Sequence, residues 1–227
     1  MGSNARIAVR ESAVWRAYVR SRYTILFCLL LLMLVALPAA ATIGIPQIAI
    51  KLLFGTCLLA AVMPNATKRT RWTLFASVLL IVGIRLASDE GTLPAFSGAA
   101  IALYGIAGLL AAAGALRFAL TAESVDRETI CAALSTYLLA GLFLGLIYWS
   151  IEQSWPGSLT GADPHTELSC IYFSFVTLAT LGYGDILPRS DIARGVAVLE
   201  TIAGQLFLAV MVARLVAAFE SPKYRRK

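Results

Sequence analysis

Six consecutive residues, Thr180 to Asp185, have the side chains and the spacing to bind a dehydrated cation. They read Thr-Leu-Gly-Tyr-Gly-Asp. A pore that strips water from K⁺ must replace the hydration shell with a ring of oxygens, and backbone carbonyls can form such a ring. A strand whose successive carbonyls all point one way needs unusual backbone dihedrals, which Gly182 and Gly184 tolerate. The Thr180 hydroxyl can add an oxygen at the inner end, and Asp185 can cap the outer mouth.

The same segment closely resembles the selectivity filter of the potassium channel superfamily, which usually reads Thr-Val-Gly-Tyr-Gly-Asp. Residues 130–219 resemble the pore module of that superfamily: an apolar span, a short apolar stretch at 166–179, the filter, and a second span follow in order. The resemblance implies that K⁺ is the permeant ion. It also implies the ion-binding residues, which are Thr180, Leu181, Gly182, Tyr183, Gly184 and Asp185, with the first four supplying carbonyl oxygens to K⁺.

Some residues around the filter follow the pattern of the superfamily and others depart from it. Tyr172 and Phe173 occupy the aromatic pair that usually packs around the filter tyrosine, and Thr177 is a third expected support. Leu181 replaces the usual Val or Ile, and Ala179 replaces a common Thr, which alters the packing behind the filter. Val176 stands where some channels keep a Glu that pairs with the filter Asp. We therefore expect Asp185 to be held differently, or less firmly.

Two residues of the last span, Glu200 and Gly204, are candidates for a role in the pore. A carboxylate near mid-membrane is costly and needs a partner. We expect Glu200 behind the filter, hydrogen-bonded to Ser174, Thr177 or Gln205; a cation site lining the pore is the alternative. Gly204 aligns with the glycine at which inner helices of the superfamily often bend, so it is either a gating hinge or a point of close helix packing.

Helix-start signals frame the pore module. Asp163-Pro164 or Thr166 can start the helix before the filter, with Glu167 in its first turn, and Ser190 can cap the last span. Arg214 lies near the cytoplasmic end of that span. We expect it to reach the membrane interface, because four Arg side chains lining the inner mouth would repel K⁺.

Composition identifies an integral membrane protein. Of the 227 residues, 59% are hydrophobic and only 14% charged, with a mean hydropathy of +0.79, more apolar than a soluble domain of this length requires. The net charge of +6 does not indicate nucleic-acid binding, because the basic residues gather at the ends of apolar segments. A single His, His165, and four scattered cysteines argue against a metal site or a catalytic triad, so we expect no enzyme and no organic cofactor. The cysteines are Cys28, Cys57, Cys131 and Cys170.

Six apolar segments are long enough to cross a hydrocarbon core of about 30 Å. Lys and Arg concentrate in the N-terminal segment, the loop after the second span and the C-terminal tail, which the positive-inside rule assigns to the cytoplasm. Both termini are then cytoplasmic, the filter opens outward, and the protein belongs in the cell membrane. The expected spans are 24–43, 46–63, 72–88, 94–119, 130–151 and 191–219.

The fold class is therefore an all-α membrane protein of six spans, with a re-entrant pore helix and filter loop between spans 5 and 6. A basic N-terminal segment (1–23) precedes a four-helix domain (24–120), and a linker (121–129) joins it to the pore domain (130–220) and a basic tail (221–227). A cleaved signal peptide ending near Ala41 is the alternative for the first span, and we favour a retained helix.

The four-helix domain stands where a voltage sensor would, but its fourth span carries only Arg117. Steep voltage gating needs three or four charges per subunit, each yielding about 2.3 kcal/mol per 100 mV, so we expect little voltage dependence. Lys51 and Arg85 are expected to form structural ion pairs, with a residual sensor or ligand site as the alternative. His165, in the outer loop, is either a pH-tuning group or an exposed residue without such a role.

These features predict a K⁺-selective, homotetrameric channel that contacts membrane lipids and conducts passively, because one chain supplies one filter strand and a ring needs four. Only eight residues follow Phe219, so gating is expected from the filter, the inner helices, lipid, tension or a separate regulatory protein. The alternatives are a weakly selective cation channel and a non-conducting sensor or regulatory subunit with the same fold.

Overall fold

The computed structural model describes residues 21–39, 54–56, 83, 97–122, 124–161 and 165–220, and these are almost entirely helical. Four helices among them are long and apolar enough to cross a membrane, in agreement with the first, fourth, fifth and sixth predicted spans. Except for 54–56 and Gly83, the second and third predicted spans lie outside the described residues, as do Lys51 and Arg85. The elements are the helix Ser21–Ala39, α4 (Ser97–Thr121), α5 (Arg127–Ser154), β1 (Leu159–Thr160), α6 (Glu167–Leu178), β2 (Leu187–Pro188) and α7 (Asp191–Glu220).

Asp126 caps the N-terminus of α5. Its carboxylate accepts hydrogen bonds from the Thr129 amide at 2.8 Å and the Thr129 hydroxyl at 2.7 Å. These bonds lower the pKa of Asp126 below its ordinary value of 3.8, because they stabilise the ionised form. The bond from the Thr129 hydroxyl has the larger effect. Glu128 adds a second negative charge in the first turn, where the helix dipole favours it. The start of α5 is thus fixed by local sequence.

Glycines on α4 allow that helix to pack closely against α5. A Cβ on Gly108 would lie 2.0 Å from the ring of Phe143, and one on Gly105 would lie 2.7 Å from a methyl group of Ile147. The bulky side chains of α5 therefore occupy space that α4 leaves open. The close packing of α4 against α5 therefore depends on these glycines.

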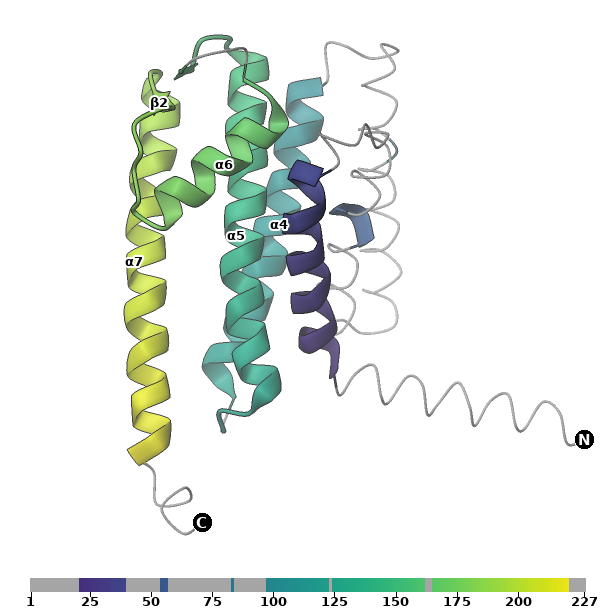
Figure 1. Cartoon of the computed structure of the whole chain (residues 1–227), viewed down its shortest axis with the longest axis vertical. Coiled ribbons are helices and arrows are strands. Elements are labelled where there is room, and N and C mark those ends of the chain that lie inside the picture. Colours follow the sequence, from purple (N-terminus) through teal and green to yellow (C-terminus); the bar gives the residue numbers. More distant parts are fainter. Residues whose placement is uncertain are drawn as a thin grey trace, which may run out of the picture.

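The helix Ser21–Ala39 begins beside the start of α5. The backbone N–H groups of Tyr23 and Thr24 donate to the Glu128 carboxylate at 2.9 and 3.3 Å, and the ring of Tyr23 stacks on Phe118 of α4. These two helices therefore start at the same end of the molecule, the lower end in Figure 1.

The segment between α5 and α7 starts and finishes at the upper end of the molecule in Figure 1. Helix α6 descends obliquely between the upper parts of α5 and α7, and the chain then returns to the level at which α6 began. β1 and β2 pair in antiparallel fashion at this end, with Leu159 opposite Pro188 and Thr160 opposite Leu187. Beside them, the Arg189 amide donates to the Ser158 carbonyl at 2.7 Å. The two short strands were not predicted from the sequence.

Both predicted helix starts in this region are confirmed. Thr166 caps α6 in a reciprocal arrangement with Ser169: the Ser169 amide donates to Thr166 Oγ1 at 3.2 Å, and the Thr166 amide donates to Ser169 Oγ at 2.7 Å. Ser190 Oγ accepts from the Ala193 amide at 3.3 Å at the start of α7. Each cap satisfies backbone donors that the first helical turn leaves free.

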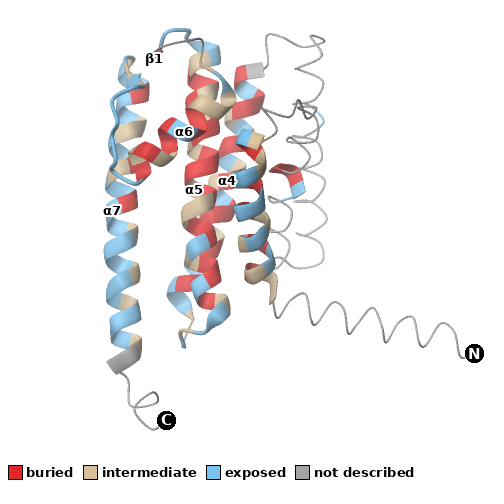
Figure 2. Ribbon diagram, viewed as in Figure 1, coloured by how far each residue is buried: buried red, intermediate tan, exposed pale blue. Residues whose placement is uncertain are grey.

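The rest of the chain covers little of the surface of helix α7. Only 11% of its apolar window is buried, against 56% for α5, and Figure 2 shows its lower half as almost entirely exposed. Such a long apolar helix requires lipid or further protein around it.

Candidate functional site

The backbone of the predicted filter alternates in conformation from residue to residue. φ is +56° at Thr180, +58° at Gly182 and +80° at Gly184, whereas Leu181 and Tyr183, between them, do not have positive φ. Alternation in the sign of φ turns every second peptide plane over, so that successive carbonyls can face the same side. Gly182 and Gly184 adopt this conformation without steric cost. A β-branched residue at positive φ is an outlier, so the strain at Thr180 indicates a local functional demand.

The inner end of the filter is hydrogen-bonded to backbone carbonyls of the last turn of α6. The amide of Thr180 donates to the carbonyl of Thr177 at 2.9 Å. The amides of Leu181 and Gly182 both donate to the carbonyl of Val176, at 2.9 and 3.4 Å. Donors of the filter thus satisfy carbonyls that a helix C-terminus leaves free, and Thr177 contributes its main-chain oxygen to this arrangement.

Asp185, at the outer end, is held by Tyr172. The Tyr172 hydroxyl donates to Asp185 Oδ2 at 2.8 Å, and Asp185 Oδ1 accepts from the amide of Ile186 at 3.1 Å. The rings of Tyr172 and Tyr183 lie nearly parallel, with centroids 6.5 Å apart and planes 6° apart. The hydrogen bond to Asp185 raises the pKa of Tyr172 above its ordinary value of 10.0. With Val176 at the usual Glu position, the aromatic residue takes over the contact with the filter Asp.

Phe173 and Glu200 lie deeper, between the three helices of the pore module. Phe173 meets the ring of Tyr148 edge to face, with centroids 4.8 Å apart. Glu200, only 1% exposed, accepts from the Tyr148 hydroxyl at 2.7 Å and lies 2.5 Å from Ser174 Oγ. Ser174 was one of the partners predicted from the sequence. Tyr148 was not, although it is one of the two tyrosines of the long apolar span α5.

Gly204 and Gln205 bring α7 against the base of the filter. A Cβ on Gly204 would lie 2.6 Å from the carbonyl oxygen of Leu178, the last residue of α6, so the glycine serves close helix packing here. Gln205 Nε2 donates to Thr180 Oγ1 at 3.1 Å. The sequence suggested Gln205 as a partner of Glu200; its side chain instead contacts the filter.

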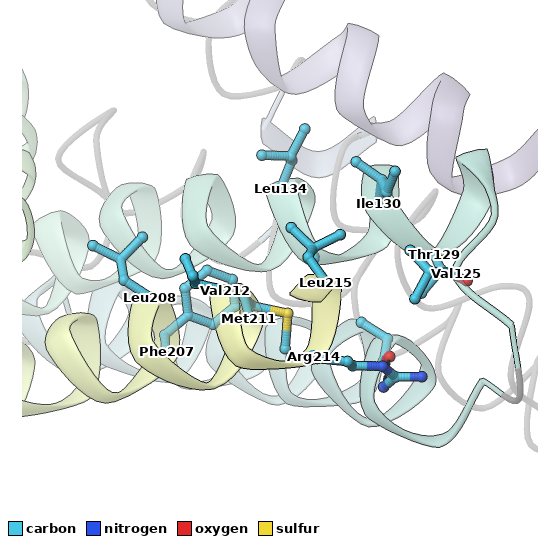
Figure 3. Close-up of a pocket in the computed structure, with 12 residues that line it drawn as sticks. Val125, Thr129, Ile130, Leu134, Phe207, Leu208, Met211, Val212, Arg214 and Leu215 are labelled. Carbon is cyan, nitrogen blue, oxygen red and sulfur yellow. Dashed lines mark hydrogen bonds between the residues drawn. The ribbon is translucent and has the colours of Figure 1, made fainter. Parts of the chain in front are cut away.

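The C-terminal part of α7 forms an apolar cavity with α5 and the end of α4, and the volume of this cavity is about 210 Å³. Figure 3 shows Leu134 and Ile130 of α5 facing Leu208, Val212 and Leu215 of α7 across it. Arg214 lies at one end, where its guanidinium donates to the carbonyls of Ala119 and Ala122 at the end of α4. The prediction that Arg214 reaches the membrane interface stays a prediction; in the structure its guanidinium pairs with carbonyls that the end of a helix leaves free.

His165 lies beside the short hairpin at the outer end of the module. A Cβ on Gly161 would lie 3.4 Å from the His165 ring. The structure thus places this histidine near the loop around the filter mouth but not within the hydrogen bonds that hold the filter.

Comparison with known proteins identifies the C-terminal part of the chain. Residues 133–221 match the family model described as Ion channel. The inward rectifier potassium channel Kirbac3.1 of Paramagnetospirillum magnetotacticum is 34% identical over 90 residues, which is 38% of this chain and 28% of the relative. Two-pore potassium channel 2 of Arabidopsis thaliana is 31% identical over 97 residues, or 42% of this chain and 21% of the relative.

A third relative, Two pore potassium channel b of Oryza sativa subsp. japonica, is 36% identical over 67 residues, or 30% of this chain and 18% of the relative. No solved structure gave a significant match. The matches span only 18% to 28% of the length of these three relatives. The matched residues are thus similar to the ion channel family, and the relatives that they match are named as potassium channels.

Proposed function

We propose that this protein is a K⁺-selective channel in which four identical chains surround one pore. The observation that carries the proposal is the alternation of φ from Thr180 to Gly184, because that backbone turns successive carbonyls to one side and lets them replace the hydration shell of K⁺. The oxygens that bind the permeant ion are the carbonyls of Thr180, Leu181, Gly182 and Tyr183 and the hydroxyl of Thr180. K⁺ is the transported ion, and the proposal includes no other cofactor.

A single chain offers one strand of the ring, so a closed symmetric assembly is required. Leu181 and Tyr183 are 55% and 66% exposed in the isolated chain, as is most of α7. Leu181 and Tyr183 belong to the filter, and α7 packs against its base, so neighbouring subunits of a tetramer would cover these apolar surfaces. The remaining exposed face of the helices is apolar enough to contact lipid.

The proposed topology has six spans, with α6 and the filter as a re-entrant loop that opens to the outside of the cell membrane and both termini in the cytoplasm. The return of the chain to the level at which α6 began supports the loop (Figure 1). The shared starting end of the helix Ser21–Ala39 and α5 supports an even number of crossings between them. Because α4 carries only Arg117, we propose that it does not gate the pore by voltage.

Two alternatives remain as outcomes of the same test. A weakly selective cation channel would follow if Leu181 and Ala179 loosen the packing behind the filter. A non-conducting sensor or regulatory subunit would keep the fold without passing ions. The conformation of the filter backbone favours K⁺ conduction over both, because it is strained at Thr180 and has no other evident use.

The test is reconstitution of the purified protein in liposomes, with flux measured under opposed K⁺ and Na⁺ gradients. K⁺-selective flux that disappears in Gly182→Asp establishes the channel. Equal K⁺ and Na⁺ flux identifies the weakly selective alternative. Absence of flux in protein that is tetrameric and folded, at all voltages and pH values tested, supports the non-conducting alternative.

A further inference from the structure

Gln205 makes a side-chain contact with the filter that no sequence motif explains. Its Nε2 lies 3.1 Å from Thr180 Oγ1, across 25 residues of sequence. We propose that Gln205 is a specificity-determining residue, which positions the Thr180 hydroxyl so that its oxygen faces the ion at the inner end of the filter. This inference rests on the proposed function.

The neighbouring glycine makes this contact possible. With a Cβ on Gly204, the side chain would come within 2.6 Å of the Leu178 carbonyl and 3.0 Å of its Cδ1. Neither group can move freely, because Leu178 ends α6 and is 2% exposed. Only glycine lets α7 lie this close to α6, and at this separation the next residue of α7 reaches Thr180.

The hydrogen bond decides which part of the Thr180 hydroxyl meets the ion. A hydroxyl carries one proton and two acceptor lone pairs, and its proton rotates to suit its surroundings. In a free hydroxyl the proton can point into the pore and repel a cation. When the Gln205 amide donates to one lone pair, the proton can no longer take that position, and the second lone pair remains as an acceptor for the ion. A preorganised oxygen binds an ion without the cost of reorienting at each passage.

The neutrality of the carboxamide matters as much as its hydrogen bond. Four carboxylates at this depth would attract any cation by charge, without regard to its size, whereas four carboxamides add no net charge. Selection then depends on the geometry of the oxygens. The carboxamide oxygen of Gln205 also remains as an acceptor, which can bind water from an ion that is losing its hydration shell.

The strained backbone gives the same contact a second effect. Thr180 is the one described non-glycine residue with positive φ, a conformation that persists only where surrounding contacts enforce it. The hydrogen bond from the Thr180 amide to the Thr177 carbonyl holds its main chain, and Gln205 holds its side chain. Loss of the side-chain contact should therefore loosen the innermost ion site in particular.

The experiment compares Gln205→Leu with Thr201→Val in the full-length protein in liposomes. Leu keeps the approximate volume of Gln and removes its hydrogen bond. Thr201 lies one turn earlier on α7, and its hydroxyl bonds to its own helix at Ala197, 2.8 Å away, so Thr201→Val removes a hydroxyl without touching the filter. We expect Gln205→Leu to lower the K⁺-to-Na⁺ flux ratio at least threefold and Thr201→Val to leave it unchanged.

A double-mutant cycle tests whether Gln205 acts through Thr180. Gln205→Leu should lower selectivity in a Thr180→Ser background, which keeps a hydroxyl, and should have no further effect in Thr180→Val.

The second measurement is the difference between the thermal midpoints of the protein in K⁺ and in Na⁺, taken in detergent, which needs no open pore. It should shrink in Gln205→Leu and stay unchanged in Thr201→Val.

Three results would overturn the inference. The first is an unchanged K⁺-to-Na⁺ flux ratio together with unchanged K⁺ stabilisation in Gln205→Leu. The second is a Gln205→Leu effect on selectivity that has the same size in the Thr180→Val background as in the Thr180→Ser background. If the wild-type protein is K⁺-selective, these results reject the role of Gln205 alone. The third is a wild-type protein with neither K⁺-selective flux nor K⁺ stabilisation, which rejects the proposed function and the inference together.

Discussion

The Tyr148 hydroxyl donates to the Glu200 carboxyl at 2.7 Å in the buried centre of the pore module. Ser174 Oγ lies 2.5 Å from the other carboxyl oxygen and 2.8 Å from the carbonyl of Gly141. A serine hydroxyl has one proton for these two acceptors. If Glu200 keeps its own proton, Glu200 donates to Ser174 and Ser174 donates to Gly141, and every group is paired. No cationic side chain in the described residues pairs with Glu200, which also favours the neutral acid.

We therefore predict that Glu200→Gln is tolerated and Glu200→Ala is not. The Gln amide can donate to Ser174 while its oxygen accepts from Tyr148, as the neutral acid does. Ala leaves the Tyr148 and Ser174 hydroxyls without this partner in a buried site, at about 1–3 kcal/mol for each unsatisfied group. The thermal midpoint of the protein in detergent measures the difference, with Tyr148→Phe as an intermediate case.

Equal losses of stability in the two variants would show that the site needs a charge. If Glu200→Gln loses as much stability as Glu200→Ala, the carboxylate is ionised and the proton count above is wrong. The infrared carbonyl stretch of a protonated carboxylic acid offers a direct check, since it should be present in the wild type and reduced in Glu200→Gln.

A second prediction concerns Tyr172 and Asp185 at the outer end of the filter. Tyr172→Phe keeps the ring beside Tyr183 and removes the hydroxyl that donates to Asp185. If that bond positions the carboxylate, Tyr172→Phe and Asp185→Asn should both reduce K⁺ flux, and the double variant should be no worse than the more severe single one. The liposome flux assay provides the measurement. Effects that add fully would mean that the two residues act independently.

The signals that predicted the fold correctly are local in sequence. Thr166 and Ser190 stand directly before apolar helices, and an N-cap depends only on the residues of the first turn. Four of the predicted spans agree with described helices because hydropathy over about 20 residues is enough to recognise a span. The β1–β2 pair was missed because two residues per strand give no periodic pattern.

The candidate filter could be located from its motif, but its supporting contacts could not. Which side chain reaches Glu200 depends on how α5 and α7 are rotated about their axes, and single residues in apolar spans do not report that rotation. Val176 indicated that Asp185 would be held in another way, without identifying Tyr172 as the partner. Gln205 was one of three partners expected for Glu200, but its side chain donates to Thr180 of the filter instead.

A third prediction separates the filter conformation from backbone strain in general. Gly184 and Gly157 have nearly the same φ, +80° and +85°, and a Cβ at either would meet no atom within 4 Å. Substitution by Ala should thus cost each about 1–2 kcal/mol of backbone energy. Of these two glycines, only Gly184 lies in the filter. We therefore expect folded Gly184→Ala protein to lose K⁺-selective flux and folded Gly157→Ala protein to keep it. Equal flux in the two variants would show that the conformation at Gly184 is not needed for conduction.

The fourth prediction concerns the cap of α5 and its dependence on pH. Removing the Asp126 carboxylate in Asp126→Ala should lower stability by about 1 kcal/mol near neutral pH, as for other N-caps. Because the pKa of Asp126 is lowered in the folded protein by its bonds to Thr129, the stabilisation is fully present above the ordinary value of 3.8. It is lost as the pH falls through the lower folded pKa.

The measurement is the difference in thermal midpoint between the wild type and Asp126→Ala from pH 7 to pH 3. This difference should stay constant down to about pH 4 to 5 and shrink below it, since both proteins then lack the charged cap. Asp126→Asn is the matched control, because Asn caps helices nearly as well as Asp without titrating. Its midpoint should exceed that of Asp126→Ala by the same amount at every pH. A difference between wild type and Asp126→Ala that does not shrink in acid would show that the carboxylate charge does not stabilise α5.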